Sequence, residues 1–254
     1  MTPPAVAFIG VPGLPMVQPG DDLPALIAGA LASAGLALQP GDVLVITSKI
    51  VSKAEGRLVD LRAVAPSARA HEIAAQVGKD PRLVELILRE STEISRAAPG
   101  VLIVTHRLGF TSANAGVDQS NVGPDREWAI LLPADPDASA RTLRVGLGSL
   151  TGVAPGVVIS DTHGRPFRLG NINVAIGVAG IPALWDQRGT TDLFGRVLQA
   201  TITAPADEIA AAAGLVTGQA AEALPVVLVR GLSLPAGDGR AADLVRPKEM
   251  DLYR

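Results

Sequence analysis

The sequence contains no cysteine among its 254 residues. That absence excludes disulfides, thiolate catalysis and cysteine-ligated zinc or iron–sulfur centres, and it is typical of a cytoplasmic protein. Aromatic residues are scarce as well, at 3% of the chain, whereas apolar residues of all kinds make up 48%. A sizeable core can therefore be buried, but it must be built mainly from Ala, Val, Leu and Ile.

An excess of positive charge is also missing, since the formal net charge is −3. Proteins that bind the nucleic-acid backbone usually carry a basic surplus, so we expect no nucleic-acid partner. No apolar run is long enough to span a membrane. The longest candidate, Asn171–Leu184, is interrupted by Gly177, Gly180 and Pro182. The proline-rich start, Met1–Pro15, has no basic region and does not resemble a signal peptide, so we expect a cytoplasmic protein without membrane contact.

Several common catalytic motifs are absent. The chain has neither the phosphate-binding loop GxxxxGK[ST] nor the dinucleotide fingerprint GxGxxG. It also lacks the zinc motif HExxH and the nucleophile elbow GxSxG. If this protein binds a nucleotide, it must do so through a less common arrangement.

The hydrophobic pattern that is present predicts strands and helices without a strict βαβ rhythm. Buried strands are predicted at Ala5–Ile9, Val43–Ile46, Val101–Val104, Ala129–Leu132, Val157–Ile159, Ile172–Val178 and Val226–Val229. Helices are predicted at Leu23–Leu36, Ala68–Val77, Asp80–Glu90, from Asp135 to about Leu147, and at Asp207–Leu215. This order favours a mixed-sheet α+β fold, in a single domain over residues 1–254. The charged tail after Ala236 is expected to pack loosely.

Asp161 and Thr162 follow directly after the predicted strand Val157–Ile159. A carboxylate beside a hydroxyl at a strand end is a suitable place for a hard divalent cation, which prefers oxygen ligands. The alternative is that Asp161 caps a turn or a helix. The two interpretations carry about equal weight from this segment alone.

A second candidate lies in the polar stretch Thr105–Pro124, which is too long for a simple turn. Within it, Asn114–Asn121 combines small residues, which would let the backbone approach a ligand, with the oxygens of Asp118 and Asn121. A ligand-free Asx-turn loop explains the same pattern and is favoured by the segment alone.

A third cluster consists of Ser48, Lys49, Ser52 and Lys53. Two lysines four positions apart could share one side of a helical turn and bind phosphate, although such a pair is usually a solvated edge. His163 lies close to Asp161 without an assigned role. Arg165 and Arg168 could bind an anionic substrate or be exposed loop charges.

Six stretches together carry a family resemblance. They are GDVLVITSKIVSKAEGRLVDL (41–61), DPRLVELILRES (80–91), THRLGFTSANAGVDQSNV (105–122), DPDASARTLR (135–144), ISDTHGRPFRLGNINVAIGVAGI (159–181) and ADEIAAAAGLVTGQ (206–219). On these motifs the chain resembles the coenzyme F420-0 γ-glutamyl ligase family from about Gly10 to Gly231. Some relatives carry a further C-terminal flavin-binding domain, which we do not expect here.

The resemblance implies a family-specific α+β fold with two intertwined lobes, and a homodimer. It implies GTP-driven addition of L-glutamate to the phospholactyl arm of the deazaflavin F420-0, releasing GDP and phosphate, with Mg²⁺ or Mn²⁺ at two sites and K⁺ as a further cation. The implied catalytic residues are Lys53, Asp118 and Asp161. The implied metal ligands are Asp118, Asp161, Thr162 and Gln219, the last at a position where relatives often carry Glu. The implied GTP contacts are Leu14, Pro15, Met16, Val17, Ser48, Lys53, Asn121 and Gly218.

Two other functions would use the same residues. A metal-dependent phosphohydrolase, or another nucleotide-driven ligase, would employ the same carboxylates without accepting the deazaflavin. A scaffold protein with an inactive site would keep the fold, but it would be expected to have lost at least one of the residues named above. The number of glutamates added and the choice between Mg²⁺ and Mn²⁺ are open at this point.

Overall fold

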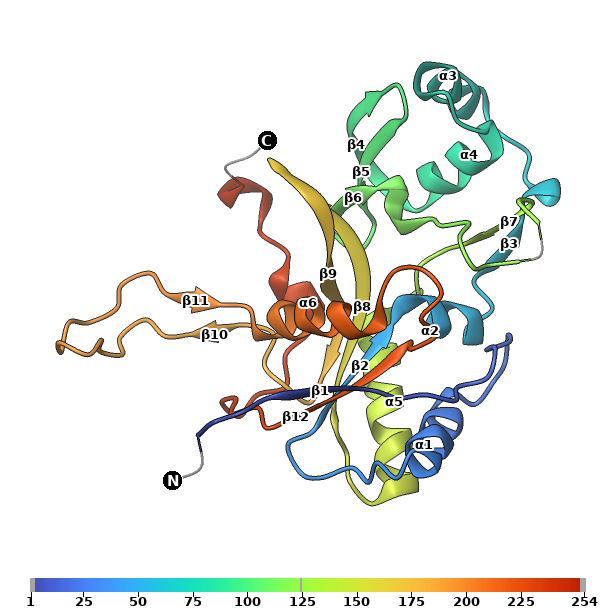
Figure 1. Cartoon of the computed structure of the whole chain (residues 1–254). Helices are drawn as coiled ribbons and strands as arrows, with labels where there is room; N and C mark the ends of the chain where they lie inside the picture. The colour runs from blue at the N-terminus through green and yellow to red at the C-terminus, as the bar shows by residue number, and fades with distance from the viewer. Residues whose placement is uncertain (1–2, 124, 252–254) are drawn as a thin grey trace.

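A computed structural model describes residues 3–123 and 125–251. Its centre is a five-stranded sheet in the order β1-β12-β2-β8-β9, in which only β2 and β8 are parallel neighbours (Figure 1). The strands are β1 (Ala7–Gly10), β12 (Val226–Arg230), β2 (Val43–Thr47), β8 (Gly156–Arg165) and β9 (Arg168–Ala179). The expected mixed-sheet α+β fold is confirmed.

Helices cover both faces of this sheet. One face packs against α1 (Leu23–Ser33), α2 (Ser48–Ala54) and α5 (Pro136–Thr151), and the other packs against α6 (Pro205–Thr217). Each face carries its own aliphatic cluster, as the scarcity of aromatic residues requires. Two of these helices are capped at their start, because Asp22 accepts a hydrogen bond from Ala25 N in α1 and Asp135 accepts one from Ala138 N in α5.

A third aliphatic cluster belongs to the segment between β2 and α5. It contains α3 (Ala68–Val77), α4 (Pro81–Arg89) and the antiparallel sheet β4-β5-β6. The strands here are β4 (Ser91–Ala98), β5 (Val101–His106) and β6 (Thr111–Ala113), with β3 (Leu58–Asp60) and β7 (Trp128–Ile130) forming a separate pair. Figure 1 shows this segment standing beside the five-stranded sheet.

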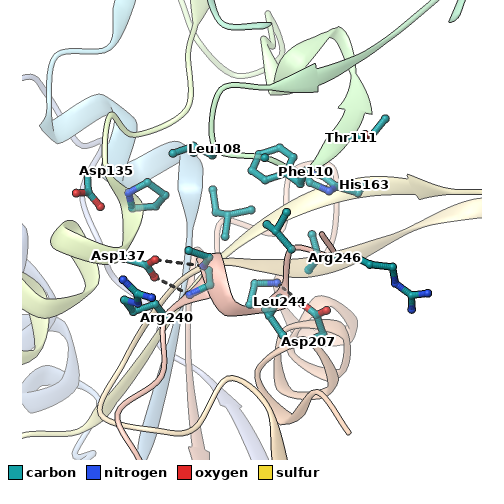
Figure 2. Close-up of a pocket in the computed structure, with 18 of the residues that line it drawn as sticks. Leu108, Phe110, Thr111, Asp135, Asp137, His163, Asp207, Arg240, Leu244 and Arg246 are labelled. Carbon is teal, nitrogen blue, oxygen red and sulfur yellow. Dashed lines mark hydrogen bonds between the residues drawn. The ribbon is translucent and has the colours of Figure 1, made fainter. Parts of the chain in front are cut away.

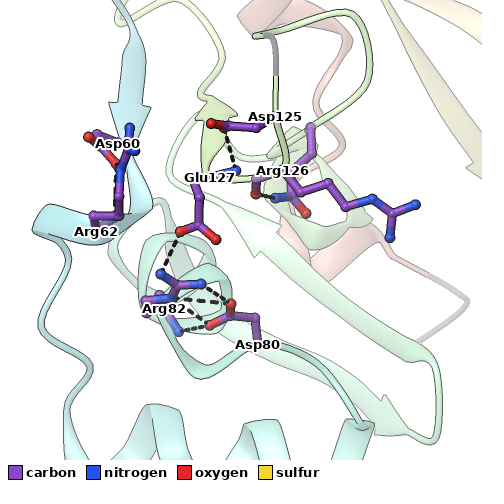
Figure 3. Close-up of polar contacts among 8 residues, drawn as sticks. Asp60, Arg62, Asp80, Arg82, Asp125, Arg126 and Glu127 are labelled. Atoms are coloured by element: carbon purple, nitrogen blue, oxygen red, sulfur yellow. Dashed lines mark hydrogen bonds and ion pairs between the residues drawn. The ribbon is translucent and has the colours of Figure 1, made fainter.

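Two polar networks link distant parts of this segment to one another. Glu90 is buried and accepts hydrogen bonds from Arg57 Nη2 and Arg107 Nε, each at 3.0 Å, while Arg57 Nε also donates to Leu132 O. Arg82 is more exposed and donates to both Asp80 and Glu127 at 2.7 Å (Figure 3). A buried hydrogen bond to a charged group usually contributes more to folding stability than an exposed ion pair does.

Three local expectations require correction. The polar stretch that begins at Thr105 contains β6 and the 3₁₀ turn η2 (Asn114–Gly116), and strand β4 was not anticipated because its exposed polar residues obscure the period-two pattern. The tail after Ala236 is better packed than expected, since the 3₁₀ turn η3 (Ala241–Leu244) buries Ala241 against the α6 face. Pro124, at the end of the polar stretch, and Met1 lie outside the described residues.

A long two-stranded arm, β10 (Trp185–Asp186) with β11 (Ile202–Thr203), extends away from the body of the molecule (Figure 1). Between its strands Leu193 and Phe194 are exposed by 101% and 85%, which is unusual for large apolar side chains. None of the helices in the described residues is long and apolar enough to cross a membrane.

Candidate functional site

Asp161 lies inside β8, because this strand continues to Arg165 instead of ending at Ile159 as expected. Antiparallel pairing with β9 sustains the strand beyond its apolar half, and this pairing is a tertiary effect that the sequence pattern does not display. Asp161 Oδ1 accepts a hydrogen bond from Ser48 Oγ at 2.8 Å. Asp161 Oδ2 lies 3.2 Å from His163 Nε2. The carboxylate is therefore held between α2 and its own strand.

Thr162 points to the opposite face of β8, as alternation along a strand requires. Its hydroxyl lies 3.1 Å from Asn173 Oδ1 and 3.0 Å from Gln219 Oε1. Gln219 Nε2 in turn donates to Asn173 Oδ1 at 3.1 Å. The structure therefore groups the Thr162 hydroxyl with Gln219 and Asn173, on the face of β8 opposite to Asp161.

Asp118 is held at the end of the polar stretch by a backbone bridge to Ile130 of β7. Its Oδ2 accepts hydrogen bonds from Lys49 Nζ at 2.8 Å and from Ser120 Oγ at 2.7 Å, and its Oδ1 accepts one from Ser120 N at 2.9 Å. Burial alone would raise the pKa of Asp118, but the hydrogen bonds from Lys49 and Ser120 outweigh it and lower this pKa. Asp118 is therefore ionised at neutral pH, and its carboxylate is paired with the Lys49 ammonium.

The small residues around Asp118 have a packing role. A side chain at Gly116 would collide with Leu132, since an added Cβ would lie 2.7 Å from Leu132 Cδ1. Ala115 is buried in the third aliphatic cluster with φ at 52°, a left-handed conformation. The small residues were expected to let the backbone approach a ligand, and in the structure they let it approach the Leu132 side chain.

Helix α2 brings the candidate carboxylates together from one turn. Ser48 contacts Asp161, and the next residue, Lys49, contacts Asp118. Lys53 lies one turn later and is buried, with 7% of its surface exposed. Burial lowers the pKa of Lys53, and the charge of Lys49 lowers it further. The solvated-edge interpretation of this lysine pair is therefore wrong for Lys53.

No carboxylate among residues 3–123 and 125–251 lies within ion-pair distance of the Lys53 ammonium. A buried cation without an acidic partner is costly, and proteins usually neutralise such a charge. An anionic ligand would supply the missing partner. This makes Lys53 the strongest indication of an anion site near α2.

The other predicted nucleotide positions lie on two loops. Leu14–Val17 belongs to the loop after β1, which is fastened to the end of α2 through Gly20 N donating to Ala54 O at 2.8 Å. Met16 is exposed by 74% whereas Val17 is buried. These positions therefore lie on a loop attached to α2, and Met16 presents its side chain to solvent.

The loop after α6 carries Gly218 and Gln219 and meets the polar stretch, since Asn121 Nδ2 donates to Ala220 O at 3.2 Å. Gly218 ends α6 with φ 65° and ψ −168°, a conformation that is essentially restricted to glycine. This hydrogen bond brings Asn121 close to the loop that carries Gly218 and Gln219, although about a hundred residues separate the two segments in the chain. Asn121 and Gly218 were both expected to contact GTP.

The atoms that could ligate a metal ion around Asp118 and Thr162 are oxygens, which suit a hard cation better than a soft one. Lys49 Nζ, itself a cation, is surrounded by Asp118 Oδ2, Ser120 O and Ser120 Oγ at 2.7–3.0 Å. The group around Thr162 is also rich in oxygen. Within the described ranges no cluster of three or more His, Asp or Glu side chains could hold a metal. A cation here would depend on one or two carboxylates, neutral oxygens and its substrate, which is how Mg²⁺ is usually bound.

A cavity of about 670 Å³ lies on the other side of His163 (Figure 2). Its walls include Phe110 and Asp207, which sequence reasoning did not single out. Phe110 is one of four phenylalanines in the chain, and that rarity was the only available signal. Arg165 and Arg168 are outside this wall, in the turn of the β8–β9 hairpin, where Arg165 Nη2 donates to Leu169 O.

Comparison with known proteins gives a consistent result. The family model described as F420-0:Gamma-glutamyl ligase matches residues 13–231. The chain is 49% identical to the coenzyme F420:L-glutamate ligase of Methanothermobacter thermautotrophicus, over 98% of this chain and 99% of that protein. It is 48% identical to the protein of the same name from Methanopyrus kandleri, over 94% and 93% of the two chains. For the Archaeoglobus fulgidus protein the identity is 44%, over 98% and 96%. The chain therefore belongs to the F420-0:γ-glutamyl ligase family.

Proposed function

We propose that this protein is a GTP-dependent ligase that joins L-glutamate to coenzyme F420-0 by an amide bond, in the biosynthesis of coenzyme F420. Family membership and the names of the relatives support glutamate ligation. The observation that carries the proposal is the arrangement on α2. Ser48 and Lys49 contact the two candidate metal carboxylates, while Lys53 offers a buried positive charge that lacks an acidic partner in the described chain.

The proposed chemistry has two steps. A carboxylate oxygen of the acceptor attacks the γ-phosphorus of GTP, the bond to the β-phosphate oxygen breaks, and GDP leaves. The resulting acyl phosphate is then attacked by the neutral glutamate amine, the amide forms, phosphate departs, and the nitrogen loses one proton to solvent and keeps the other as the amide N–H. Lys53 binds the phosphate oxygens and stabilises the charge that develops on them. A covalent enzyme intermediate is unnecessary, which agrees with the absence of cysteine.

Divalent cations belong to this proposal. Asp118 and Asp161 would hold one Mg²⁺ or Mn²⁺, and Thr162 with Gln219 would provide oxygens for a second; a K⁺ ion is proposed in addition. When bound, such ions neutralise phosphate charge and orient the groups that react. Ser48 keeps Asp161 in position by its hydrogen bond, and Lys49 keeps Asp118 ionised before nucleotide binding.

We also propose a homodimer with the intertwined two-lobed fold of the family. The exposed Leu193 and Phe194 on the β10–β11 arm support an association that would cover them. Light scattering of the purified protein at several concentrations should give the mass of two chains. A monomer mass at all concentrations would contradict this part of the proposal.

The test of the function is product analysis. The protein is incubated with F420-0, L-glutamate, GTP and Mg²⁺, and the acceptor is followed by mass spectrometry. We expect the mass of the acceptor to rise by one glutamyl residue or more, together with GDP formation. GDP formation without any change in the acceptor would favour the phosphohydrolase alternative, and no reaction of any kind would favour an inactive scaffold.

A further inference from the structure

The cavity beside His163 is a second site, separate from the oxygen clusters around Asp118 and Thr162. It is enclosed by the β5–β6 turn, the start of α5, the middle of β8 and β9, α6, and the segment that begins at Arg240. Its apolar wall consists of Leu108, Phe110, Val174, Ile176 and Leu244. A volume of about 670 Å³ falls in the range of cavities that enclose most of a ligand the size of a drug or a cofactor.

Two of the acidic residues that line this cavity, Asp137 and Asp207, already accept hydrogen bonds from the backbone. Asp137 Oδ1 accepts hydrogen bonds from the backbone N–H groups of Val178 and Ala241, both at 2.8 Å. Figure 2 marks the hydrogen bonds between Asp137 and the segment that follows Arg240. Asp207 Oδ1 accepts from Ala175 N at 2.8 Å. These carboxylates support the wall and the η3 turn, so they are poorly placed to bind a ligand cation.

The arginines of the cavity are in a different position. Arg141 and Arg246 are exposed, and neither has an ion-pair partner among residues 3–123 and 125–251. Arg240 pairs with Asp243 of its own turn. Two guanidinium groups therefore remain available at the opening, where planar guanidinium can bind carboxylate or phosphate through two parallel hydrogen bonds.

An aromatic stack connects this cavity to the candidate metal site. Phe110 stacks on the buried ring of His106, with 5.0 Å between centroids and 7° between planes. Phe110 is also 4.9 Å from His163 and tilted against it by 46°. His163 is nine-tenths buried, and its Nε2 has no hydrogen-bond partner in the described chain although Asp161 Oδ2 lies 3.2 Å away. Figure 2 shows Phe110 and His163 side by side on one wall.

We propose that this cavity binds the flat, anionic aromatic substrate, which under the proposed function is the deazaflavin acceptor. The ring lies against the apolar wall that includes Phe110, and the anionic arm is held by Arg141 and Arg246. The reacting carboxylate is placed at the His163 end, next to Asp161. Free L-glutamate is too small to fill this cavity. This inference rests on the proposed function for the name of the ligand, but its test does not require catalysis.

The test is a direct titration of the acceptor into the protein without GTP or glutamate, followed by deazaflavin fluorescence. Arg141→Glu and Arg246→Glu should each weaken acceptor binding by about tenfold or more, since each replaces an attractive contact by a repulsive one. Arg69→Glu is the matched control, because Arg69 is an exposed arginine on α3 that does not line this cavity. It should leave acceptor binding within about twofold of the parent protein. Unchanged binding in both cavity variants would overturn the proposal.

A second variant tests the aromatic wall. Phe110→Leu keeps the site apolar and should weaken acceptor binding several-fold while leaving GTP binding unchanged, with folding checked by its thermal unfolding curve. Loss of GTP affinity in the same variant, with acceptor affinity retained, would contradict the assignment. If the parent protein binds the acceptor in this cavity but forms no amide, the proposed function fails and the site survives. If it forms the amide while the cavity variants keep their acceptor affinity, the site assignment fails and the function survives.

Discussion

Ser48 Oγ donates a hydrogen bond to Asp161 Oδ1 at 2.8 Å, although 113 residues separate the two in the chain. Ser48 is the first residue of α2, and β2, which precedes it, is the parallel neighbour of β8. Since parallel strands end at the same edge of a sheet, the start of α2 and the middle of β8 meet there. The same turn carries Lys49 to Asp118, so this short helix organises both carboxylates.

The first prediction concerns Asp161. Asp161→Asn keeps the shape of the side chain but removes the charge that a cation site needs. We expect ligation to fall by at least about 100-fold at saturating metal, with an unchanged unfolding midpoint. Ser48→Ala removes only the supporting hydrogen bond and should cost about 10- to 100-fold, partly rescued by more metal. Near-normal turnover of Asp161→Asn would refute the role assigned to this carboxylate.

Lys53 gives a second prediction, in which activity and stability move in opposite directions. Lys53→Met should raise the apparent KM for GTP and lower kcat, because a charge at the phosphates is lost. The affinity for glutamate should change much less. The control is Lys248→Met, whose ammonium is exposed and pairs with Glu93 on the surface. The KM for GTP and kcat of both variants are measured by titrating GTP at saturating acceptor, metal and glutamate. Unchanged values in Lys53→Met would mean that the phosphates bind elsewhere.

The stability of Lys53→Met should equal or exceed that of the parent at neutral pH. Burial lowers the pKa of Lys53, which means that its charged form costs folding free energy below that pKa. Methionine has similar length and no charge, so the cost disappears. A urea-unfolding midpoint well below that of the parent would show that Lys53 has a structural partner.

Glu90 supplies the third prediction, for stability against pH. Burial opposes ionisation, but the His106 ring, whose Nε2 lies 3.6 Å from Glu90 Oε2, the hydrogen bond from Arg107 and the charge of Arg57 together lower the pKa of Glu90 to about 2. Because the folded pKa is below the unfolded one, the stabilisation is fully present above about pH 4.5 and is lost as the pH falls towards 2. Glu90→Gln should therefore cost about 1–3 kcal/mol at pH 7, and this difference should shrink below pH 4.5.

The comparison variant is Glu127→Gln, which weakens the more exposed pair with Arg82 shown in Figure 3. It should cost less than about 1 kcal/mol at pH 7. Urea unfolding of both variants at pH 7 and pH 3 checks these values. Equal effects of the two substitutions at pH 7 would show that burial gives the Glu90 network no advantage over the exposed pair.

A fourth prediction concerns the nucleotide. GTP should be preferred to ATP, an expectation that comes from family membership, since the chain has no recognisable guanine-reading motif. Steady-state kinetics with each nucleotide at saturating acceptor and glutamate provide the comparison. Equal kcat/KM for the two nucleotides would eliminate the preference.

The sequence predicted the local structure better than the site. The helix starts predicted at Leu23 and Asp80 lie at or next to the observed starts, where Asp22 and Asp80 cap the helices through local hydrogen bonds. Asp161 was identified as a candidate residue, but its place within a long strand was missed, since that strand depends on its distant partner β9. The cavity residue Phe110 could not be recognised, because its stacking on His106 and contact with His163 exist only after folding.

The most direct test of the account is an omission experiment on the parent protein. GDP release is measured with GTP, Mg²⁺, the deazaflavin acceptor and L-glutamate together, and then with the acceptor or the glutamate left out. The account predicts sustained GDP release only in the complete mixture, at one GDP for each glutamate joined to the acceptor. Sustained GDP release at the same rate without the acceptor would contradict it.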